Sequence, residues 1–541
     1  MPILNFKGKS FVQNHHFGVK YHQLVPHQGK SLTDKVNLYD NLVVHGDNLK
    51  ALKALLPTYA GKVKCIYIDP PYNTGNEQWI YNDNVNSPMM REWLGNVVDK
   101  EDLNRHDKWL CMMMPRLKLL RELLSEDGVI FVSIDDDEQH HLRMLMDEVF
   151  GSNNFITNII WQKKFSPQND AKYFSDMHDF IICYAKNRND GDINHGWIRN
   201  LLPRSEEMNS RYKNPDNDPR GPWTSGDLSV KTYSEEYDYP IETPSGRIVH
   251  PPKGSCWRVS KEKLNTLIKD NRIWFGKEGK SVPRLKRFLS EVQGGLVPGT
   301  VWLNQEVGHN QQAKQYLNQI LHDKESFNTP KPVSLIKRII QIASNEDSII
   351  LDSFAGSGST AHAVLEQNKE DNGNRKFILV EMEDYADELT AERVRRVIQG
   401  VPTAKDDGLR KGLGGTFSYF TLGAPIEMEA ILHGKSLPSY EDLARYVFFT
   451  STGEEFDPSN IDQDQNFIGE SSQYEVYLFY RPDMEYLKST SLNLETAKQL
   501  GELNGKKRLV FAPMKYLDQE YLHEYKIEFS QLPFEIYRMK D

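Results

Sequence analysis

Residues 65–75, CIYIDPPYNTG, form a short apolar strand pattern that ends in one acid, two prolines and an aromatic ring. Proline fixes its own φ angle and restricts the residue before it, so Asp69, Pro70 and Pro71 are expected to be extended. The Asp69 carboxylate and the Pro70 carbonyl would then offer two acceptors to one planar amino group, and Tyr72 would stack on the ring that carries it. Two acceptors also keep lone-pair density on the nitrogen as it attacks an electrophile. This stretch predicts a site that activates a heterocyclic amine.

A second stretch, ILDSFAGSGSTAH at residues 350–362, predicts a turn that binds a nucleotide-like ligand. A strand precedes the G-x-G-x-x-A spacing that begins at Gly356, a helix follows it, and Glu381 ends the next strand, as in the dinucleotide fingerprint. The glycines indicate a ligand close to the backbone, and Glu381 indicates an acceptor for ribose hydroxyls. Asp352, at the strand tip, would repel a pyrophosphate, whereas a cofactor with an ammonium and a sulfonium group tolerates it or favours it.

Alternating strand and helix patterns surround both stretches, which is the order of an α/β protein with a mostly parallel sheet. They run over residues 37–162 and again over residues 301–402. Between them, residues 163–300 are rich in proline, glycine, asparagine and aromatic residues, which predicts a loop-rich inserted domain. Residues 403–541 follow a glycine-rich break and have strand patterns of their own, so a C-terminal α+β domain is expected. Residues 1–36 form an N-terminal segment.

Length and charge bound the kind of protein. With 541 residues the chain is too long for one ordinary core, and two to four domains are expected. The net charge of −10 argues at first against a nucleic-acid partner, because phosphate contacts need a basic surface. However, residues 161–300 hold 23 lysines and arginines against 18 acidic residues, whereas residues 401–541 hold 15 against 23. The local positive excess permits nucleic-acid binding by the insertion.

Several other classes of protein are disfavoured by the sequence. The apolar runs are far shorter than the ~20 residues that span a bilayer, and the first residues do not have a signal-peptide pattern, so a cytoplasmic protein without membrane contact is expected. The four cysteines have no C-x-x-C spacing, which supports neither a disulfide framework nor a zinc site. His140 and His141 lie on a polar helical stretch and are expected to face solvent rather than a metal. We therefore expect no metal.

DPPY together with FAGSGST resembles the motifs of amino-methyltransferases that modify DNA with S-adenosylmethionine. The order of the motifs, catalytic before cofactor, is similar to that of the β-ordered group of adenine-N6 enzymes, and the resemblance covers about residues 37–400. It implies a Rossmann-like methyltransferase sheet in permuted order that acts on double-stranded DNA. It also implies that a flipped-out adenine is held by the catalytic residues Asp69, Pro70, Pro71 and Tyr72.

The same resemblance implies a set of cofactor-binding and base-pocket residues. The residues carried over to S-adenosylmethionine are Asp352, Phe354, Ala355, Gly356, Ser357, Gly358 and Glu381, with Thr329, Lys331 and Pro332 from a T-x-K-P element. HGDNLKAL resembles a family element near the base pocket, which adds Asp47 and Asn48.

A narrower resemblance links the chain to the modification subunits of type III restriction systems, through DPPYNTG, SIDDDE and the C-terminal domain. It implies a homodimer, a target-recognition role for the insertion and a separate restriction subunit. The chain contains G-K-S four times, each time without the glycine five residues earlier that a phosphate-binding loop needs. Any ATPase or cleavage activity is therefore expected in a partner chain.

Three alternatives remain open at this point. Cytosine-N4 methylation is the nearest, but enzymes of the family with that target more often begin the motif with serine, so Asp69 favours adenine. A nicotinamide-dependent dehydrogenase could use the same glycine-rich fingerprint, but it would leave DPPY and the basic insertion unexplained. A catalytically silent DNA-recognition subunit would not need both motifs intact. The sequence also leaves open whether Asp69 or water takes the proton that leaves N6.

Overall fold

The protein is described by a computed structural model in which the chain forms two compact units. The described residues are 4–74, 105–189, 191, 196–292, 294–322, 327, 329–426, 437–501 and 505–532. The larger unit combines Met1–Asn200 with Gly299–Asp541, and the smaller unit is Leu201–Pro298. The insertion thus leaves the larger unit and returns to it over about a hundred residues.

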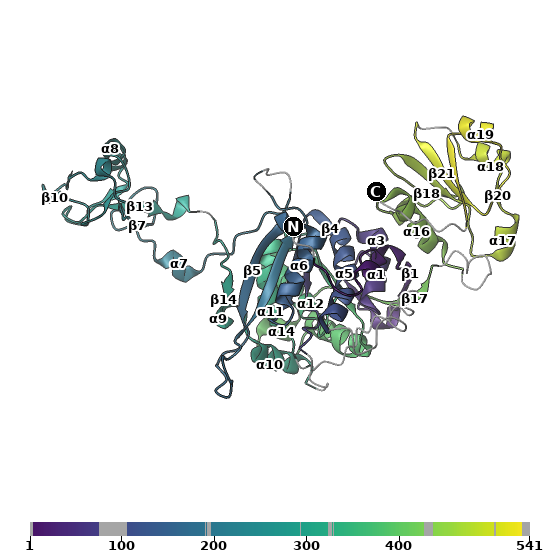
Figure 1. The fold of residues 1–541 in the computed structure, drawn as a ribbon, viewed down its shortest axis with the longest axis horizontal. Helices are drawn as coiled ribbons and strands as arrows, with labels where there is room; N and C mark the ends of the chain where they lie inside the picture. The colour runs from purple at the N-terminus through teal and green to yellow at the C-terminus, as the bar shows by residue number, and fades with distance from the viewer. Residues whose placement is uncertain are drawn as a thin grey trace. The chain divides into compact units, whose positions relative to one another are not determined.

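Within the described residues, ten strands form the central sheet of the larger unit (Figure 1). Their spatial order is β1 (His22–Pro26), β17 (Ser418–Pro425), β2 (Leu42–His45), β16 (Lys376–Glu381), β15 (Ile349–Asp352), β3 (Val63–Ile68), β4 (Leu124–Ile134), β6 (His178–Ala185), β5 (Phe155–Gln162) and β14 (Val301–Trp302). The strands from β17 to β4 pair in parallel, whereas β6 is antiparallel to both β4 and β5. β15, from the later half of the chain, lies between β16 and β3. This confirms the predicted α/β sheet in permuted order.

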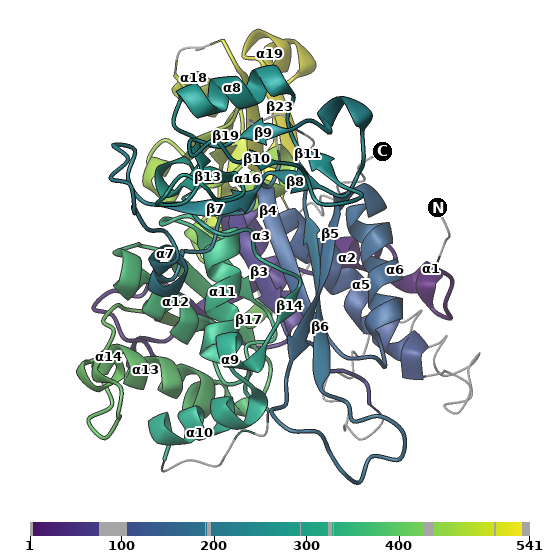
Figure 2. The same cartoon turned by 90° about the vertical axis from the view of Figure 1, so that its left-hand side faces the viewer.

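Helices cover both faces of this sheet (Figure 2). On one side α3 (Asn48–Tyr59), α5 (Arg105–Leu123) and α6 (Gln139–Phe150) pack against one another, and on the other side α11 (Val333–Ala343) packs against α12 (Ser359–Asp371). The apolar face of α5 is fully buried, as Trp109, Met113 and Leu120 show. Covered faces explain why the central strands are continuous apolar runs rather than alternating ones.

Two strands of the sheet come from segments that the sequence patterns place in other domains. β6 falls inside the predicted insertion, 163–300, and β17 falls inside the predicted C-terminal domain, 403–541. β6 contains the buried apolar run IICYA. The composition of residues 163–300 as a whole is that of a loop, so composition alone does not reveal this strand. The compact insertion consequently begins at Leu201 rather than at residue 163. The functional roles of the domains stay predictions.

The smaller unit contains a short antiparallel sheet whose neighbour in the core is the helix α8 (Lys261–Lys269). β12 (Ile273–Trp274), β13 (Arg284–Phe288) and β7 (Trp223–Asp227) form the sheet. Its own apolar core is made of Leu228, Tyr239, Ile241, Val249, Trp257, Leu264, Ile273 and Phe275. The unit contains 17 lysines and arginines against 13 acidic residues.

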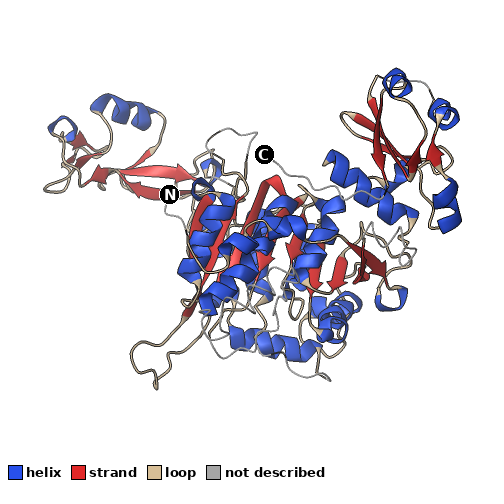
Figure 3. Cartoon of the chain, turned by 45° about the vertical axis from the view of Figure 1, so that its right-hand side comes forward, coloured by secondary structure: helices blue, strands red, loops and turns tan. Residues whose placement is uncertain are grey.

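The C-terminal part has an α+β arrangement (Figure 3). Its four-stranded sheet has the order β18 (Phe467–Glu470), β19 (Tyr474–Leu478), β21 (Lys507–Ala512) and β23 (Ile527–Gln531), with α16 (Tyr440–Thr452) against one face. Side chains of β19 alternate between two cores, as expected for a sheet covered on both faces. Among the residues that the structure describes, every helix is too short or too polar to cross a bilayer.

Candidate active site

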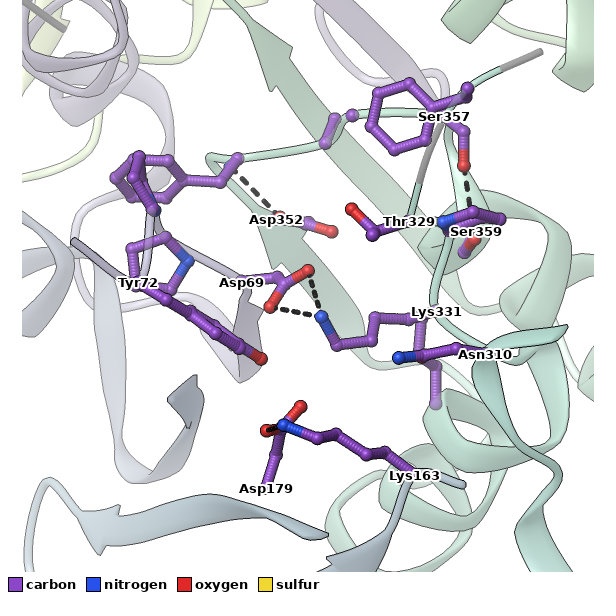
Figure 4. A pocket seen from close by; sticks show the side chains of 18 of the residues that line it. Asp69, Tyr72, Lys163, Asp179, Asn310, Thr329, Lys331, Asp352, Ser357 and Ser359 are labelled. Carbon is purple, nitrogen blue, oxygen red and sulfur yellow. Dashed lines mark hydrogen bonds and ion pairs between the residues drawn. The ribbon is translucent and has the colours of Figure 1, made fainter. Parts of the chain in front are cut away.

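A cavity of about 830 Å³ lies at the carboxyl ends of the central strands (Figure 4). Because β15 pairs in parallel with both β16 and β3, the residues that follow these three strands meet at one edge of the sheet. This is the edge where open α/β sheets bind ligands. The predicted residues that line the cavity are Asp69, Pro70, Pro71, Tyr72, Thr329, Lys331, Asp352, Phe354, Ala355, Gly356, Ser357 and Glu381. The two motifs, almost 300 residues apart in sequence, thus share one cavity large enough for a cofactor and part of a substrate.

Asp69 accepts two hydrogen bonds from one ammonium group. The Nζ atom of Lys331 lies 2.7 Å from Oδ1 and 2.6 Å from Oδ2 of Asp69, and 4.9 Å from the centre of the Tyr72 ring. The sequence resemblance implies that Lys331 binds the cofactor, but here its ammonium group contacts the Asp69 carboxylate. The carboxylate is therefore oriented toward a nitrogen donor that sits against the Tyr72 ring. Burial and the nearby Asp69 charge hold the pKa of Tyr72 well above its usual range, so the ring stays neutral.

The turn that carries these residues is fixed by contacts from α5 and from Glu138, the residue that precedes α6. Trp109 on α5 donates a hydrogen bond from Nε1 to the Pro71 carbonyl at 2.7 Å. Asn73 has a φ of 60°, in the left-handed region that asparagine tolerates better than most residues, and its buried side chain donates to Glu138. The backbone of the DPPY turn is thus fixed at Pro71 by Trp109 and at Asn73 by Glu138.

Glu138 is the centre of a polar cluster that sequence patterns did not reveal. Its carboxylate is fully buried, and the Nδ1 atoms of His106 and His141 lie 2.7 and 2.9 Å from different carboxylate oxygens. His141 is therefore half-buried and engaged, whereas the sequence predicts that it faces solvent. The ligand atoms of these three residues lie within 4.8 Å of one another, a spacing found once among the described residues. Since both oxygens already accept hydrogen bonds and Asn73 donates to one of them, we assign the cluster to holding the DPPY turn.

The cofactor turn has the backbone that its glycines predict. Gly356 and Gly358 have φ angles of 51° and 77°, in the left-handed region. A Cβ atom on Gly356 would come within 3.2 Å of the Phe327 ring, so space as well as conformation favours glycine. Gly358 does not line the cavity; it is the residue before the first turn of α12, where it sets the direction of the helix.

Two buried carboxylates face the cavity from neighbouring strands. Glu381 accepts hydrogen bonds from the backbone amides of Gly356 at 2.6 Å, Met382 at 2.9 Å and Glu383 at 3.0 Å. Asp352 accepts from the Thr360 hydroxyl at 2.6 Å and from a backbone amide. Burial raises the pKa of each carboxyl to about 7. Two acids that are costly to ionise without a partner suit a cationic ligand with hydroxyl groups.

These two acids give the protein without ligand an expected pH dependence. The folded protein keeps their protons up to pH of about 7, whereas the unfolded chain releases them near 3.8 and 4.5. The folded state therefore binds more protons within this window, and its free energy of unfolding falls as pH rises from about 4 to about 7. Glu381→Gln should make the slope shallower by up to about 1.4 kcal/mol per pH unit, as thermal melting in a pH series would measure. An unchanged slope would show that Glu381 is already ionised at low pH.

Sequence patterns missed several residues of the cavity. The rings of Phe327 and Tyr385 contact edge to face, with centroids 5.9 Å apart, beside the cofactor turn. Across the cavity, Lys163 forms ion pairs with Asp179 at 2.6 Å and with Asp176 at 2.7 Å. Asp179 is buried near the start of β6, next to an apolar run. An acid beside an apolar run was the only local pattern that could have indicated this part of the cavity. The two rings follow no local pattern at all.

Besides Gly358, three predicted residues lie outside the cavity. Asp47 caps α3 by accepting the Lys50 amide at 3.0 Å. Asn48 is fully buried and donates to the Ser353 carbonyl at 3.1 Å, so it braces the end of β15. Pro332 precedes the first turn of α11.

Comparisons with known proteins agree with this geometry. Residues 63–392 match the DNA methylase family. The type III restriction-modification enzyme StyLTI Mod subunit of Salmonella typhimurium strain LT2 is 32% identical over 83% of this chain and 70% of its own length. The EcoPI Mod subunit of Escherichia phage P1 is 30% identical over 72% of this chain and 67% of its own length. Among solved structures, the cytosine-N4-specific PvuII DNA methyltransferase is similar over 65% of this chain and 86% of its own, with a TM-score of 0.34 and 13% identity, a likeness too weak to argue from.

A mostly parallel sheet that brings a G-x-G turn and a DPPY turn to one cavity is typical of a methyltransferase. The chain belongs to the DNA methylase family. These matches confirm the predicted family and its kinship to type III modification subunits. They also confirm the predicted enzyme class and the predicted methyl donor, S-adenosylmethionine. The dehydrogenase alternative has no support.

Proposed function

We propose that this protein transfers a methyl group from S-adenosylmethionine to the exocyclic N6 of a flipped-out adenine in double-stranded DNA, as the modification subunit of a type III restriction system. The observation that carries the proposal is the single cavity in which Asp69 and Tyr72 stand beside Gly356 and Glu381. Asp69 favours adenine over cytosine within the family. The predicted separate restriction subunit and the homodimer belong to the same proposal.

The residues of the cofactor end fit S-adenosylmethionine. The left-handed Gly356 keeps the backbone open to a ligand, and the buried Asp352 and Glu381 carboxylates match its ammonium and hydroxyl groups. The Phe327 ring offers a face or edge for the adenine of the cofactor. When bound, the cofactor supplies an electrophilic methyl group attached to a sulfonium.

At the catalytic end the protein orients the nucleophile. The Asp69 carboxylate and the Pro70 carbonyl accept the two hydrogens of the target amine, and the Tyr72 ring stacks on the base. To do so, Asp69 exchanges its contact with Lys331 for one with the substrate. Most of the rate enhancement is then positioning, which can supply on the order of 7–11 kcal/mol. The proton that leaves N6 goes to Asp69 or to water.

The target atom lies inside the duplex, so the base must leave its stack, at a cost of a few kcal/mol. Contacts with phosphates offset this cost, and we assign sequence recognition to the smaller unit, Leu201–Pro298, with its excess of basic side chains.

A direct test is to express the protein in a host without DNA methylation and to sequence the host DNA for modified bases. N6-methyladenine at one recurring sequence is expected. N4-methylcytosine would replace the adenine assignment with the cytosine alternative. DNA without methylation, together with no transfer of labelled methyl groups by the purified protein, would contradict the proposed function.

Glu381→Ala should weaken S-adenosylmethionine binding by about 1–3 kcal/mol, because ribose hydroxyls lose a charged acceptor. The substitution also frees the Gly356 amide that Glu381 holds at 2.6 Å. Affinity for DNA without the cofactor should change little. Calorimetry measures both affinities, and the exposed Glu388→Ala on the following segment is the matched control. Unaltered cofactor affinity in Glu381→Ala would remove Glu381 from the site.

A further inference from the structure

The loop between β5 and β6, residues 163–177, carries strongly exposed aromatic rings. Phe174 is 95% exposed and Tyr173 is 81% exposed, the two highest values for large apolar side chains among the described residues. Phe165, in the same loop, is 67% exposed. Figure 1 and Figure 2 both show this loop reaching beyond the ends of its two strands. Exposed rings that gather on one loop of a folded protein indicate a contact with a partner.

The stem of the loop is part of the active-site wall. The Lys163 amide donates to the Met177 carbonyl at 2.9 Å, which continues the β5–β6 pairing, and Asn304 donates to the Lys164 carbonyl at 3.2 Å. Lys163, Lys164 and Asp176 line the cavity that holds the catalytic turn. The loop that carries the rings is therefore fixed at its base by Lys163, Lys164 and Met177. This base borders the cavity that the target base must enter.

The chemistry of the tip fits nucleic acid. The loop contains three lysines and two aspartates, and the Nζ atom of Lys172 lies 5.3 Å from the centre of the Tyr173 ring. Aromatic rings next to cationic side chains stack on bases, and apolar wedges separate base steps in a duplex. A duplex that has lost one base from its stack offers a gap for such a ring, and filling the gap lowers the cost of extrusion.

We propose that the tip of this loop, through Phe174 and Tyr173, stacks into the DNA at the step that the target base leaves, and so stabilises the extruded state. The partner is the duplex itself, and the contact needs no particular base, since every base has an aromatic face. This inference rests on the proposed function, because it places the rings beside a flipped-out base. It assigns to the two rings a positioning role and no contact with the reacting atoms.

The test compares one protein variant on two DNA substrates. The double variant Tyr173→Ala, Phe174→Ala is assayed for single-turnover methylation on a duplex with the sequence that the wild-type protein methylates, and on the same duplex with an abasic site opposite the target. On the paired duplex the rate should fall by about 10-fold to 100-fold, in the range of one or two lost stacking contacts. On the abasic duplex, where extrusion is already easy, the rate should lie within about 3-fold of wild type.

Controls separate the rings from general effects. Tyr516→Ala removes another strongly exposed ring, in the C-terminal part, and should leave both rates unchanged. Phe174→Trp, with Tyr173 kept, retains a stacking face and should keep most of the wild-type rate on the paired duplex. A 2-aminopurine at the target position should brighten with wild-type protein and S-adenosylmethionine, and much less with the double variant.

Each outcome decides the question. Equal losses on both substrates, or no loss on the paired duplex, would overturn the inference while leaving the proposed function intact. Normal methylation together with an altered oligomeric state in gel filtration would reassign the rings to a protein contact. If the wild-type protein methylates neither substrate, the proposed function fails, and the inference fails with it.

Discussion

Replacing Asp69 with alanine is expected to lower single-turnover methylation by at least about 10²–10³, the effect of losing one preorganised electrostatic contact in a site that excludes water. The substitution leaves Pro70, Pro71 and Tyr72 in place, so the base can still be seated. Affinity for DNA should survive because it depends mainly on phosphate contacts. Affinity for S-adenosylmethionine should survive because Glu381 ends β16 and Gly356 lies in the turn after β15, on other segments than Asp69.

The structure adds a control that the sequence alone did not offer. Asp69 is the partner of the largely buried Lys331 ammonium, so Asp69→Ala leaves that charge without its carboxylate. Asp69→Asn keeps one acceptor and the shape of the side chain, and should retain the fold more closely while still losing most of the activity. Asp127→Ala, at the opposite end of the sheet and half exposed, is the matched acidic control. Near-wild-type turnover in Asp69→Ala, with the melting temperature unchanged, would show that DPPY is a structural turn.

The sequence predicts the fold and both motifs because each depends on local patterns. Apolar strands that end in Asp69, Asp352 and Glu381 are readable as short segments, and parallel pairing brings their carboxyl ends to one edge without further information. The left-handed Gly356 follows from its spacing in the same way. The strands of the sheet therefore position the predicted core of the site.

The remaining parts of the site depend on contacts between distant segments, which leave no local pattern. Lys331 reaches Asp69 across 262 residues, and His106 reaches Glu138 across 32. Phe327 stands alone in a polar segment, so nothing near it in the sequence indicates a cavity wall. The contact of Asn48 with the Ser353 carbonyl likewise joins residues 305 positions apart, and no local pattern indicates it.

A second large effect is expected in the smaller unit from Lys286→Met. The Lys286 side chain is fully buried and pairs with Asp216 and with Asp218, whose own side chain is also fully buried. Arg220 donates two hydrogen bonds to Asp218, at 2.9 and 2.8 Å, and together with Lys286 it holds the pKa of Asp218 well below its usual range. Removing one partner of a buried ion pair typically costs about 3–5 kcal/mol. Arg220 stays on Asp218 and Trp223 still donates to Asp216, so the low end of this range is expected for Lys286→Met.

The loss of stability in Lys286→Met should affect DNA recognition and leave cofactor binding intact. Leu201–Pro298 is a compact unit with its own core, so Lys286→Met should unfold or loosen it while the cofactor turn in the larger unit keeps its structure. S-adenosylmethionine affinity measured by calorimetry should stay within about 3-fold of wild type, a change below 1 kcal/mol. Site-specific methylation should be lost, and limited proteolysis should cut within residues 201–298.

Lys280→Met, where an exposed lysine pairs with the exposed Glu278, is the matched control and should change stability by no more than about 0.5 kcal/mol. If Lys286→Met loses its proteolytic resistance and still methylates the same sequence at the wild-type rate, recognition lies in the larger unit, and the smaller unit has another role.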